Sequence, residues 1–190
     1  MTVFNALIIA CWLVFIAYWA YSAFSAKRNI RPRYGYFSGI AVRVGAAIVV
    51  ILIVHFMLGG DISALSFKVS LNPFVECIGV LLCAFGIGLA VWARYYLGKN
   101  WGMPMSVKEN PELVTSGPYA RVRHPIYTGV LMAIFGSMLV AGLWWLMVFV
   151  AAAAYFTFSA RMEEALMLRQ FPDAYPAYKA RTKMLIPYIL

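Results

Sequence analysis

Four long apolar segments, separated by short polar stretches, constrain the fold of this chain more than any other feature. They are residues 3–24, 40–58, 74–97 and 126–159. An α-helix of about 20 apolar residues crosses the hydrocarbon core of a bilayer. Because 64% of the residues are hydrophobic and only 12% are charged, against about 25% charged in soluble domains, the sequence predicts an integral membrane protein.

The last apolar segment is too long for one crossing. As a single helix, residues 126–159 would form a rod of roughly 50 Å, so we expect a break near Ala141-Gly142 and two short spans. The predicted fold class is all-α: a polytopic membrane protein with five transmembrane helices, the last two forming a helical hairpin. Residues 1–190 are expected to form one integral membrane domain, with a two-helix N-terminal scaffold at 1–72 and a core at 73–190.

The basic residues predict the orientation in the membrane. The chain holds 16 Lys and Arg residues against 7 Asp and Glu residues, and the basic ones lie in short loops instead of on one polar face. With five crossings and the N-terminus outside, all of them except Lys68 lie on the cytoplasmic side or near its helix ends. Lys27 and Arg28 follow the first apolar run, which favours a retained helix over a signal peptide. This distribution argues against a nucleic-acid-binding surface.

The sequence predicts no metal site. The three cysteines, Cys11, Cys77 and Cys83, form no CxxC pair, and none lies beside a histidine. His55, inside the second predicted span, has no acid, cysteine or second histidine near it in the sequence, so a packing role is expected for it.

Two polar clusters are predicted at the same side of the membrane, and the first is Arg123-His124-Pro125-x-Tyr127. Proline is favoured in the first turn of a helix, so Pro125 should begin the fourth span and place His124 at its N-terminal edge. Such an edge is a natural site for an anion. His124 and Tyr127 lie three residues apart and should share one face.

The second cluster is Arg161 with Glu163 and Glu164, where the fifth span is expected to continue into the cytosol. Two adjacent carboxylates can hold a cation or a pair of hydroxyls, and an arginine can hold a carboxylate in bidentate geometry. The alternative for both clusters is simple anchoring at the membrane interface, where such side chains are common.

Three motifs occur in a fixed order in the second half of the chain. They are residues 113–119 (LVTSGPY), residues 123–127 (RHPIY), and Glu163-Glu164 followed by Phe171, Tyr175, Tyr178 and Ile186-Pro187. This combination resembles the isoprenylcysteine carboxyl methyltransferase family, which includes the related phospholipid N-methyltransferases. The resemblance covers about residues 92–187. One departure is Pro172, where the family usually has glycine, and it concerns the local turn.

The resemblance implies a membrane-embedded methyltransferase that uses S-adenosylmethionine, with residues 73–190 as the methyltransferase core. The cofactor would lie between the cytoplasmic ends of the last helices and the C-terminal segment. The implied catalytic residues are Arg161 and Glu164. The implied cofactor-binding residues are Leu113, Val114, Gly117, Tyr119, Arg123, His124, Tyr127, Glu163 and Glu164.

The implied acceptor is the carboxylate of a prenylated cysteine or a similar lipophilic molecule that enters from the bilayer. A carboxylate is already ionised at neutral pH, so alignment and desolvation can supply most of the acceleration, with Arg161 orienting the carboxylate. An amine acceptor must lose a proton, and Glu164 or His124 would then be the base.

Three alternatives remain at this point. The first is a phospholipid amine N-methyltransferase, and the second is a sterol-type membrane reductase that uses NADPH. The third is a scaffold or transporter, although the spans have neither the internal repeat nor the paired broken helices typical of transporters. Membrane lipids are expected partners, and the sequence indicates no oligomeric state.

Overall fold

The computed structural model describes residues 2–23, 29–30, 72–101, 107–108, 112–142 and 144–186. The predicted second span, residues 40–58, lies outside them, as does His55. The described part is helical except for two-residue strands β1 (Asn29–Ile30) and β2 (Val107–Lys108), which pair antiparallel. Its α-helices are α1 (Val3–Ala23), α3 (Pro73–Leu97), α4 (Pro125–Ala141), α5 (Trp144–Gln170) and α6 (Ala174–Arg181). The all-α prediction is confirmed.

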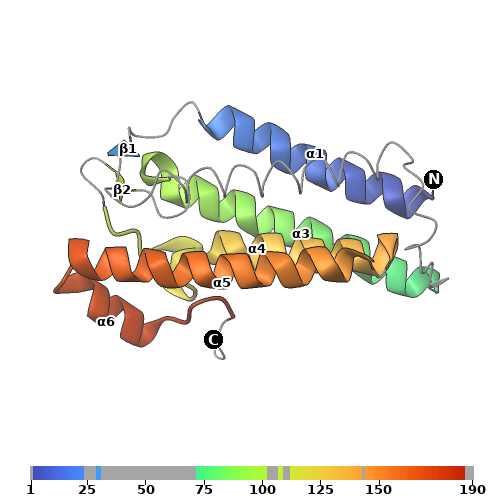
Figure 1. Ribbon diagram of the computed structural model, residues 1–190. Helices are drawn as coiled ribbons and strands as arrows, with labels where there is room; N and C mark the ends of the chain where they lie inside the picture. The colour runs from blue at the N-terminus through green and yellow to red at the C-terminus, as the bar shows by residue number, and fades with distance from the viewer. Residues whose placement is uncertain are drawn as a thin grey trace.

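The four longer helices run side by side, and the short α6 lies against the end of α5 (Figure 1). By length and composition, α1, α3 and α5 are each able to cross a membrane, and α4 is a shorter apolar helix. Large apolar side chains project outward from them, including Leu13, Phe85 and Val150, which are all more than half exposed. An exposed apolar surface of this extent is expected where lipid replaces water as the solvent.

The predicted break in the last apolar segment is confirmed. Helix α4 ends at Ala141, and Gly142 has φ 110°, a conformation that favours glycine. The Gly142 N–H donates to the Met138 carbonyl at 3.1 Å, and α5 begins at Trp144. The chain therefore reverses here, and α4 and α5 pack together as a helical hairpin (Figure 1).

Helices α3 and α4 touch through their backbones along a seam of paired glycines. A Cβ atom added to Gly86 would lie 2.5 Å from the Gly129 carbonyl oxygen, and one added to Gly129 would lie 2.5 Å from the Gly86 oxygen. Gly79 and Gly136 form a second such pair. The spacing of Gly79, Cys83, Gly86 and Gly88 predicts close approach of a neighbouring helix, as small residues allow in membranes. This is confirmed at Gly79 and Gly86, whereas nothing lies within 4 Å of a Cβ atom added to Gly88. The partner glycines on α4 were not predicted.

Helix α1 is held to the bundle by a buried hydrogen bond. The Trp12 indole Nε1 donates to the Ser137 Oγ at 3.0 Å, and that hydroxyl donates to the Ala133 carbonyl at 2.8 Å. The Trp12 ring also stacks on Trp145 of α5, with centroids 6.4 Å apart. These contacts join α1, α4 and α5 in one apolar core.

Arg94 ties the ends of α1 and α3 together. It is only 2% exposed, and its guanidinium donates to the Ser22 carbonyl at 2.6 Å and to the Gly98 carbonyl at 2.8 Å. The same group lies 4.6 Å from the centroid of the Trp101 ring. Backbone carbonyls and an aromatic face thus hold this buried cation. Among the described residues no acid pairs with it, and its Nε has no hydrogen-bond partner. The sequence did not single out this residue.

Candidate functional site

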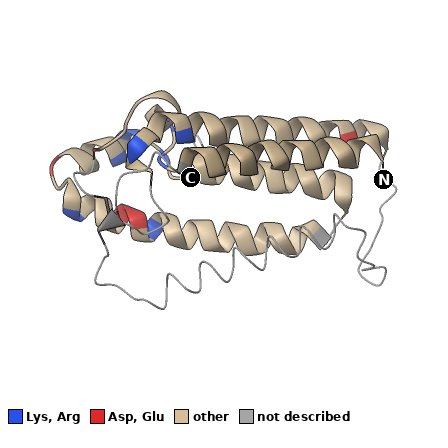
Figure 2. Cartoon of the chain, turned by 90° about the horizontal axis from the view of Figure 1, so that it is seen from above, with Lys and Arg blue, Asp and Glu red and all other residues tan. Residues whose placement is uncertain are grey.

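Charged residues gather at one end of the bundle, where α3 ends, α4 begins and α5 passes into α6. Lysines and arginines of the described residues concentrate there, with acidic residues among them (Figure 2). Both predicted polar clusters lie at this end, because Pro125 begins α4 and the acidic pair lies in the last part of α5. The structure therefore places the candidate site at the polar end of an apolar bundle.

The chain reaches α4 through a tight turn. Gly117, with φ 60°, opens the 3₁₀ turn η2 (Gly117–Ala120), and a Cβ atom there would lie 2.5 Å from the Tyr96 ring. Glycine is therefore required by both its conformation and the contact. Tyr119 is buried, and its carbonyl accepts a hydrogen bond from the Tyr178 hydroxyl at 2.7 Å. The turn is thus fixed against α6.

The C-terminal segment, residues 182–186, folds back over the start of α4. The N–H groups of Arg123 and His124 donate to the carbonyls of Lys183 (2.8 Å) and Met184 (3.1 Å). The Thr128 hydroxyl donates to the Leu185 carbonyl at 2.6 Å. The amides of Arg123 and His124, just before α4, are thus already bonded to the C-terminal segment, and the anion site expected at this edge stays a prediction. The side chains of this edge remain as candidate ligand groups.

Glu163 joins the two predicted clusters. The Tyr127 hydroxyl donates to its Oε1 at 2.6 Å, and the His124 Nδ1 lies 3.4 Å from its Oε2. The His124 ring is stacked on Tyr127, with centroids 5.4 Å apart, and Tyr127 is stacked on Phe156 of α5 at 4.6 Å. His124 and Tyr127 therefore share one face, as their spacing predicted.

Glu164 has a different set of partners. Its Oε1 accepts from the Arg123 Nε at 2.6 Å, and its Oε2 accepts from the Lys179 Nζ of α6 at 2.7 Å. Arg123 also donates to the carbonyls of Lys179 and Thr182. The Glu164 side chain is 7% exposed and that of Glu163 is 25% exposed. Glu164 thus fastens α6 and the C-terminal segment to α5. Sequence reasoning missed Lys179, because nothing marks it among the other basic residues of the tail.

The electrostatic surroundings of His124 favour its protonated form. Burial by itself lowers the pKa of His124, but the adjacent carboxylates of Glu163 and Glu164 outweigh it and raise the pKa above its ordinary value. The His124 Nε2 lies 3.7 Å from the Glu164 Oε1, which is too far for a hydrogen bond. Among the described residues this buried nitrogen has no hydrogen-bond partner.

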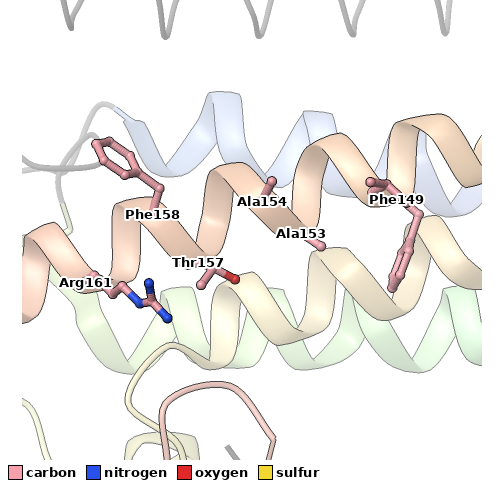
Figure 3. Close-up of a pocket in the computed structure, with 7 residues that line it drawn as sticks. Phe149, Ala153, Ala154, Thr157, Phe158 and Arg161 are labelled. Atoms are coloured by element: carbon pink, nitrogen blue, oxygen red, sulfur yellow. The ribbon is translucent and has the colours of Figure 1, made fainter.

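Arg161 lies apart from this cluster. It is exposed and contributes to an open groove of about 500 Å³ along α5, where its side chain projects near Thr157 (Figure 3). The other residues that line the groove are Phe149, Val150, Ala153, Ala154 and Phe158. Side chains two positions apart on an α-helix point in directions that differ by about 200°. Arg161 and Glu163 therefore face opposite sides of α5. Within the described part of the chain Arg161 forms no ion pair, and the predicted cluster of Arg161 with both acids is not formed.

The segment before the turn lines a second cavity. Leu113 and Val114 contribute to a polar cavity of about 500 Å³, together with residues 96–100, 112, 115 and 116. The phenol of the buried Tyr119 interacts electrostatically with both Arg94 and Glu163. Burial is the main cause that raises the pKa of the Tyr119 hydroxyl, which therefore stays neutral.

Three comparisons place this chain among known proteins. The family model for phospholipid methyltransferase matches residues 75–174. Protein-S-isoprenylcysteine O-methyltransferase of Schizosaccharomyces pombe is 31% identical over 101 residues, which are 51% of this chain and 43% of that protein. This chain thus spans less than half the length of that relative.

A solved structure has a similar fold. The eukaryotic intramembrane Ras methyltransferase, an isoprenylcysteine carboxyl methyltransferase, aligns with a TM-score of 0.54 at 20% identity. The alignment covers 83% of this chain and 55% of the other. The resemblance drawn from the ordered motifs is confirmed, because the matched family model covers more than half of the sequence. The chain belongs to the phospholipid methyltransferase family.

Proposed function

We propose that this protein is a membrane methyltransferase that uses S-adenosylmethionine and methylates the carboxylate of a prenylated cysteine or a similar lipophilic acceptor. One observation carries the proposal: Glu163, His124 and Tyr127 meet at the polar end of an apolar helical bundle. The family membership supports the chemistry, and the relative from S. pombe supports this class of acceptor.

The proposed topology has five crossings, the last two formed by the hairpin of α4 and α5. The N-terminus lies outside, and the C-terminus and the site lie in the cytoplasm. The gathering of lysines and arginines at one end of the bundle supports this orientation (Figure 2). Residues 1–72 form the scaffold, and residues 73–190 form the methyltransferase core.

The residues at the polar end fit S-adenosylmethionine. Its ammonium and ribose hydroxyls need acceptors such as the Glu163 carboxylate, and the buried His124 Nε2 is a donor that has no partner in the described residues. The cavity beside Leu113 and Val114, of about 500 Å³, is within the usual range of ligand pockets, roughly 300–1,000 Å³. We assign the adenosine to this cavity, and Gly117 and Tyr119 follow Ser116, its last lining residue, along the chain. When bound, the cofactor supplies a methyl group activated by a sulfonium.

The two adjacent acids have different roles in this proposal. Glu163, with Tyr127 and His124, contacts the cofactor. Both oxygens of Glu164 accept from cations, Arg123 and Lys179, so its role is to hold the C-terminal segment in place over the site. Glu164 and Arg123 therefore act on the cofactor through that segment.

Arg161 and the groove along α5 are the proposed route for the acceptor. From Phe149 to Arg161 the helix rises about 18 Å, and the lining between them is apolar apart from Thr157. A lipid tail can lie in this groove while Arg161 draws its carboxylate toward the interface. A carboxylate acceptor is already ionised, so it would take up a methyl group without losing a proton, and the residues around it would need only to align it and to exclude water.

The test is methyl transfer from radiolabelled S-adenosylmethionine by the protein in nanodiscs. A farnesylated cysteine with a free carboxylate and phosphatidylethanolamine are offered as acceptors in separate reactions. We expect a product from the farnesylated cysteine whose label is released by mild base, as an ester requires. A base-stable product from phosphatidylethanolamine alone would favour amine methylation, which the description of the family model makes the second candidate. Arg161→Met should lower use of the carboxylate acceptor.

A further inference from the structure

Two buried hydroxyls on α5 have no assigned role. The side-chain oxygens of Tyr155 and Ser159 are buried next to each other, and apart from one another they have no hydrogen-bond partner in the described part of the chain. Leaving such a group unpaired costs free energy, so native proteins seldom keep one without a reason. A ligand that pairs with these hydroxyls would supply that reason.

Other hydroxyls of the chain show that Ser159 is unusual. Those of Thr128, Ser137 and Thr182 each donate to the carbonyl four residues earlier, at 3.2, 2.8 and 2.7 Å. This bond is the usual way for a helix to satisfy a serine or threonine in an apolar environment. Ser159 is fully buried in the same kind of helix and forms no such bond.

The two hydroxyls belong to the same site as Glu163. Tyr155, Ser159 and Glu163 follow each other at intervals of four residues, so they lie on one face of α5. Tyr155 interacts electrostatically with Glu163 and with Tyr127. Ala160, the residue after Ser159, packs against Tyr127. The hydroxyls therefore lie one and two helical turns deeper in the apolar bundle than the acid.

Unpaired donors thus surround one carboxylate. The buried His124 Nε2 lacks a hydrogen-bond partner within the described ranges, and the Tyr155 and Ser159 hydroxyls have none there beyond each other. All three groups belong to residues near Glu163. An acid with several donors beside it matches the head group of an α-amino acid, which carries an ammonium and a carboxylate on the same carbon. Hydroxyls in a site of low dielectric are effective donors to such a carboxylate.

We propose that the hydroxyls of Tyr155 and Ser159, together with His124, bind the α-carboxylate of the methionine part of the cofactor while Glu163 binds its ammonium. This inference rests on the proposed function and adds an amino-acid subsite to it. The subsite distinguishes ligands that carry the amino-acid head group from those that lack it. The adenosine remains assigned to the cavity beside Leu113.

The test compares two ligands by calorimetry on the detergent-purified full chain. S-adenosylhomocysteine carries the amino-acid group, and 5′-methylthioadenosine has the same adenosine and sulfur without it. We expect wild type to prefer S-adenosylhomocysteine, and Ser159→Ala and Tyr155→Phe each to weaken its binding about tenfold or more, as loss of a hydrogen bond to a charged group predicts. Affinity for 5′-methylthioadenosine should not change.

A stability measurement separates binding from a structural role. Removing an unpaired buried hydroxyl should leave the melting temperature of the ligand-free protein unchanged or higher in Ser159→Ala. Ser137→Ala is the matched control: its hydroxyl is fully paired, so this variant should melt lower and keep the ligand preference.

Two results would overturn the subsite. One is that Ser159→Ala and Tyr155→Phe bind S-adenosylhomocysteine as tightly as wild type does. The other is that both ligands weaken equally, which would show that the hydroxyls do not recognise the amino-acid group. If folded wild type bound neither ligand, the proposed function itself would fail, so the two failures are distinguishable.

Discussion

The glycine seam and the polar end are built in opposite ways, although α4 takes part in both. Along the seam, Gly129 and Gly136 bring the backbone of α4 onto that of α3 with no charged group. At the polar end, the same helix begins at Pro125, and the residues just before it, Arg123 and His124, are held by ion pairs and hydrogen bonds to α5 and to the C-terminal segment. Packing along the seam requires residues without side chains, and the polar end is held together by long charged side chains.

The two regions therefore have different roles, one in holding the helices and one in forming the site. Backbone contact along the seam leaves α4 little freedom to slide or tilt, since packed interiors resist small displacements. His124 and Tyr127 are thereby presented from a fixed support. The C-terminal segment is held by side chains that can release it, as Lys179 is 43% exposed. We therefore expect substitutions that add bulk along the seam to break the fold, and substitutions that remove a charge at the polar end to act on the site.

The largest expected effect is from Gly86→Val. Its side chain would meet the backbone of α4 within 2.5 Å, so α3 and α4 must separate, at a cost of about 3 kcal/mol or more. We expect little folded protein by size-exclusion chromatography in detergent. Gly88→Ala, two residues away, is the control, because nothing lies within 4 Å of its added Cβ. It should raise stability by about 0.5–1 kcal/mol. A wild-type melting temperature for Gly86→Val would refute backbone contact in the seam.

The next effect is from Glu164→Gln. Removing this charge leaves Arg123 without its buried partner, and breaking a buried pair costs about 3–5 kcal/mol. We expect the lower value, measured by chemical unfolding, because Lys179 is partly exposed. The C-terminal segment should also become sensitive to trypsin at Lys183.

Glu163→Gln sharpens the contrast between the two acids. Glu163 is the more exposed of the pair, so its substitution should cost less stability than that of Glu164. It should lower cofactor affinity more strongly, by about tenfold or more, as measured by calorimetry. Equal losses of stability in both variants would contradict the separate roles.

A smaller effect is expected from the titration of His124. Because its folded-state pKa is raised, its contribution to stability is fully present below about pH 6.5, the unfolded value. The contribution is lost as the pH rises through the folded-state pKa. The groups that face His124 are Glu163, Glu164 and Tyr127. Wild type should therefore lose melting temperature above neutral pH more steeply than His124→Asn. Parallel profiles would count against a protonated His124.

The smallest effect is from Lys179→Met. Pairs with an exposed partner contribute less than about 1 kcal/mol, so the melting temperature should fall only slightly. Trypsin cleavage at Lys183 should still accelerate, because α6 loses one of its contacts with α5. If cleavage were unchanged, Arg123 alone would be holding the segment.

The sequence was sufficient to predict those parts of the fold that depend only on residues close together in the chain. The break at Gly142, the start of α4 at Pro125 and the shared face of His124 and Tyr127 all follow from spacing and from the conformations of glycine and proline. Close approach at Gly79 and Gly86 was predicted for the same reason.

The remaining features depend on how helices are rotated against each other. Glu163 and Glu164 are adjacent, and only the position of α6 decides which of them meets Lys179. Arg161 was expected beside both acids, but the helical period turns it to the outer groove. The C-terminal segment folds back because carbonyls of residues 183–185 accept hydrogen bonds from residues at the start of α4. Such contacts join residues far apart in the sequence, so no local pattern reveals them.

The most direct test of the central claim is calorimetric titration of S-adenosylhomocysteine into the purified wild type, Glu163→Gln and Gly88→Ala. We predict micromolar-range binding, as is usual for a soluble cofactor, by wild type and Gly88→Ala, and binding weaker by about tenfold or more by a folded Glu163→Gln. The absence of binding by well-folded wild type would contradict the assignment of His124, Tyr127 and Glu163 to a cofactor site.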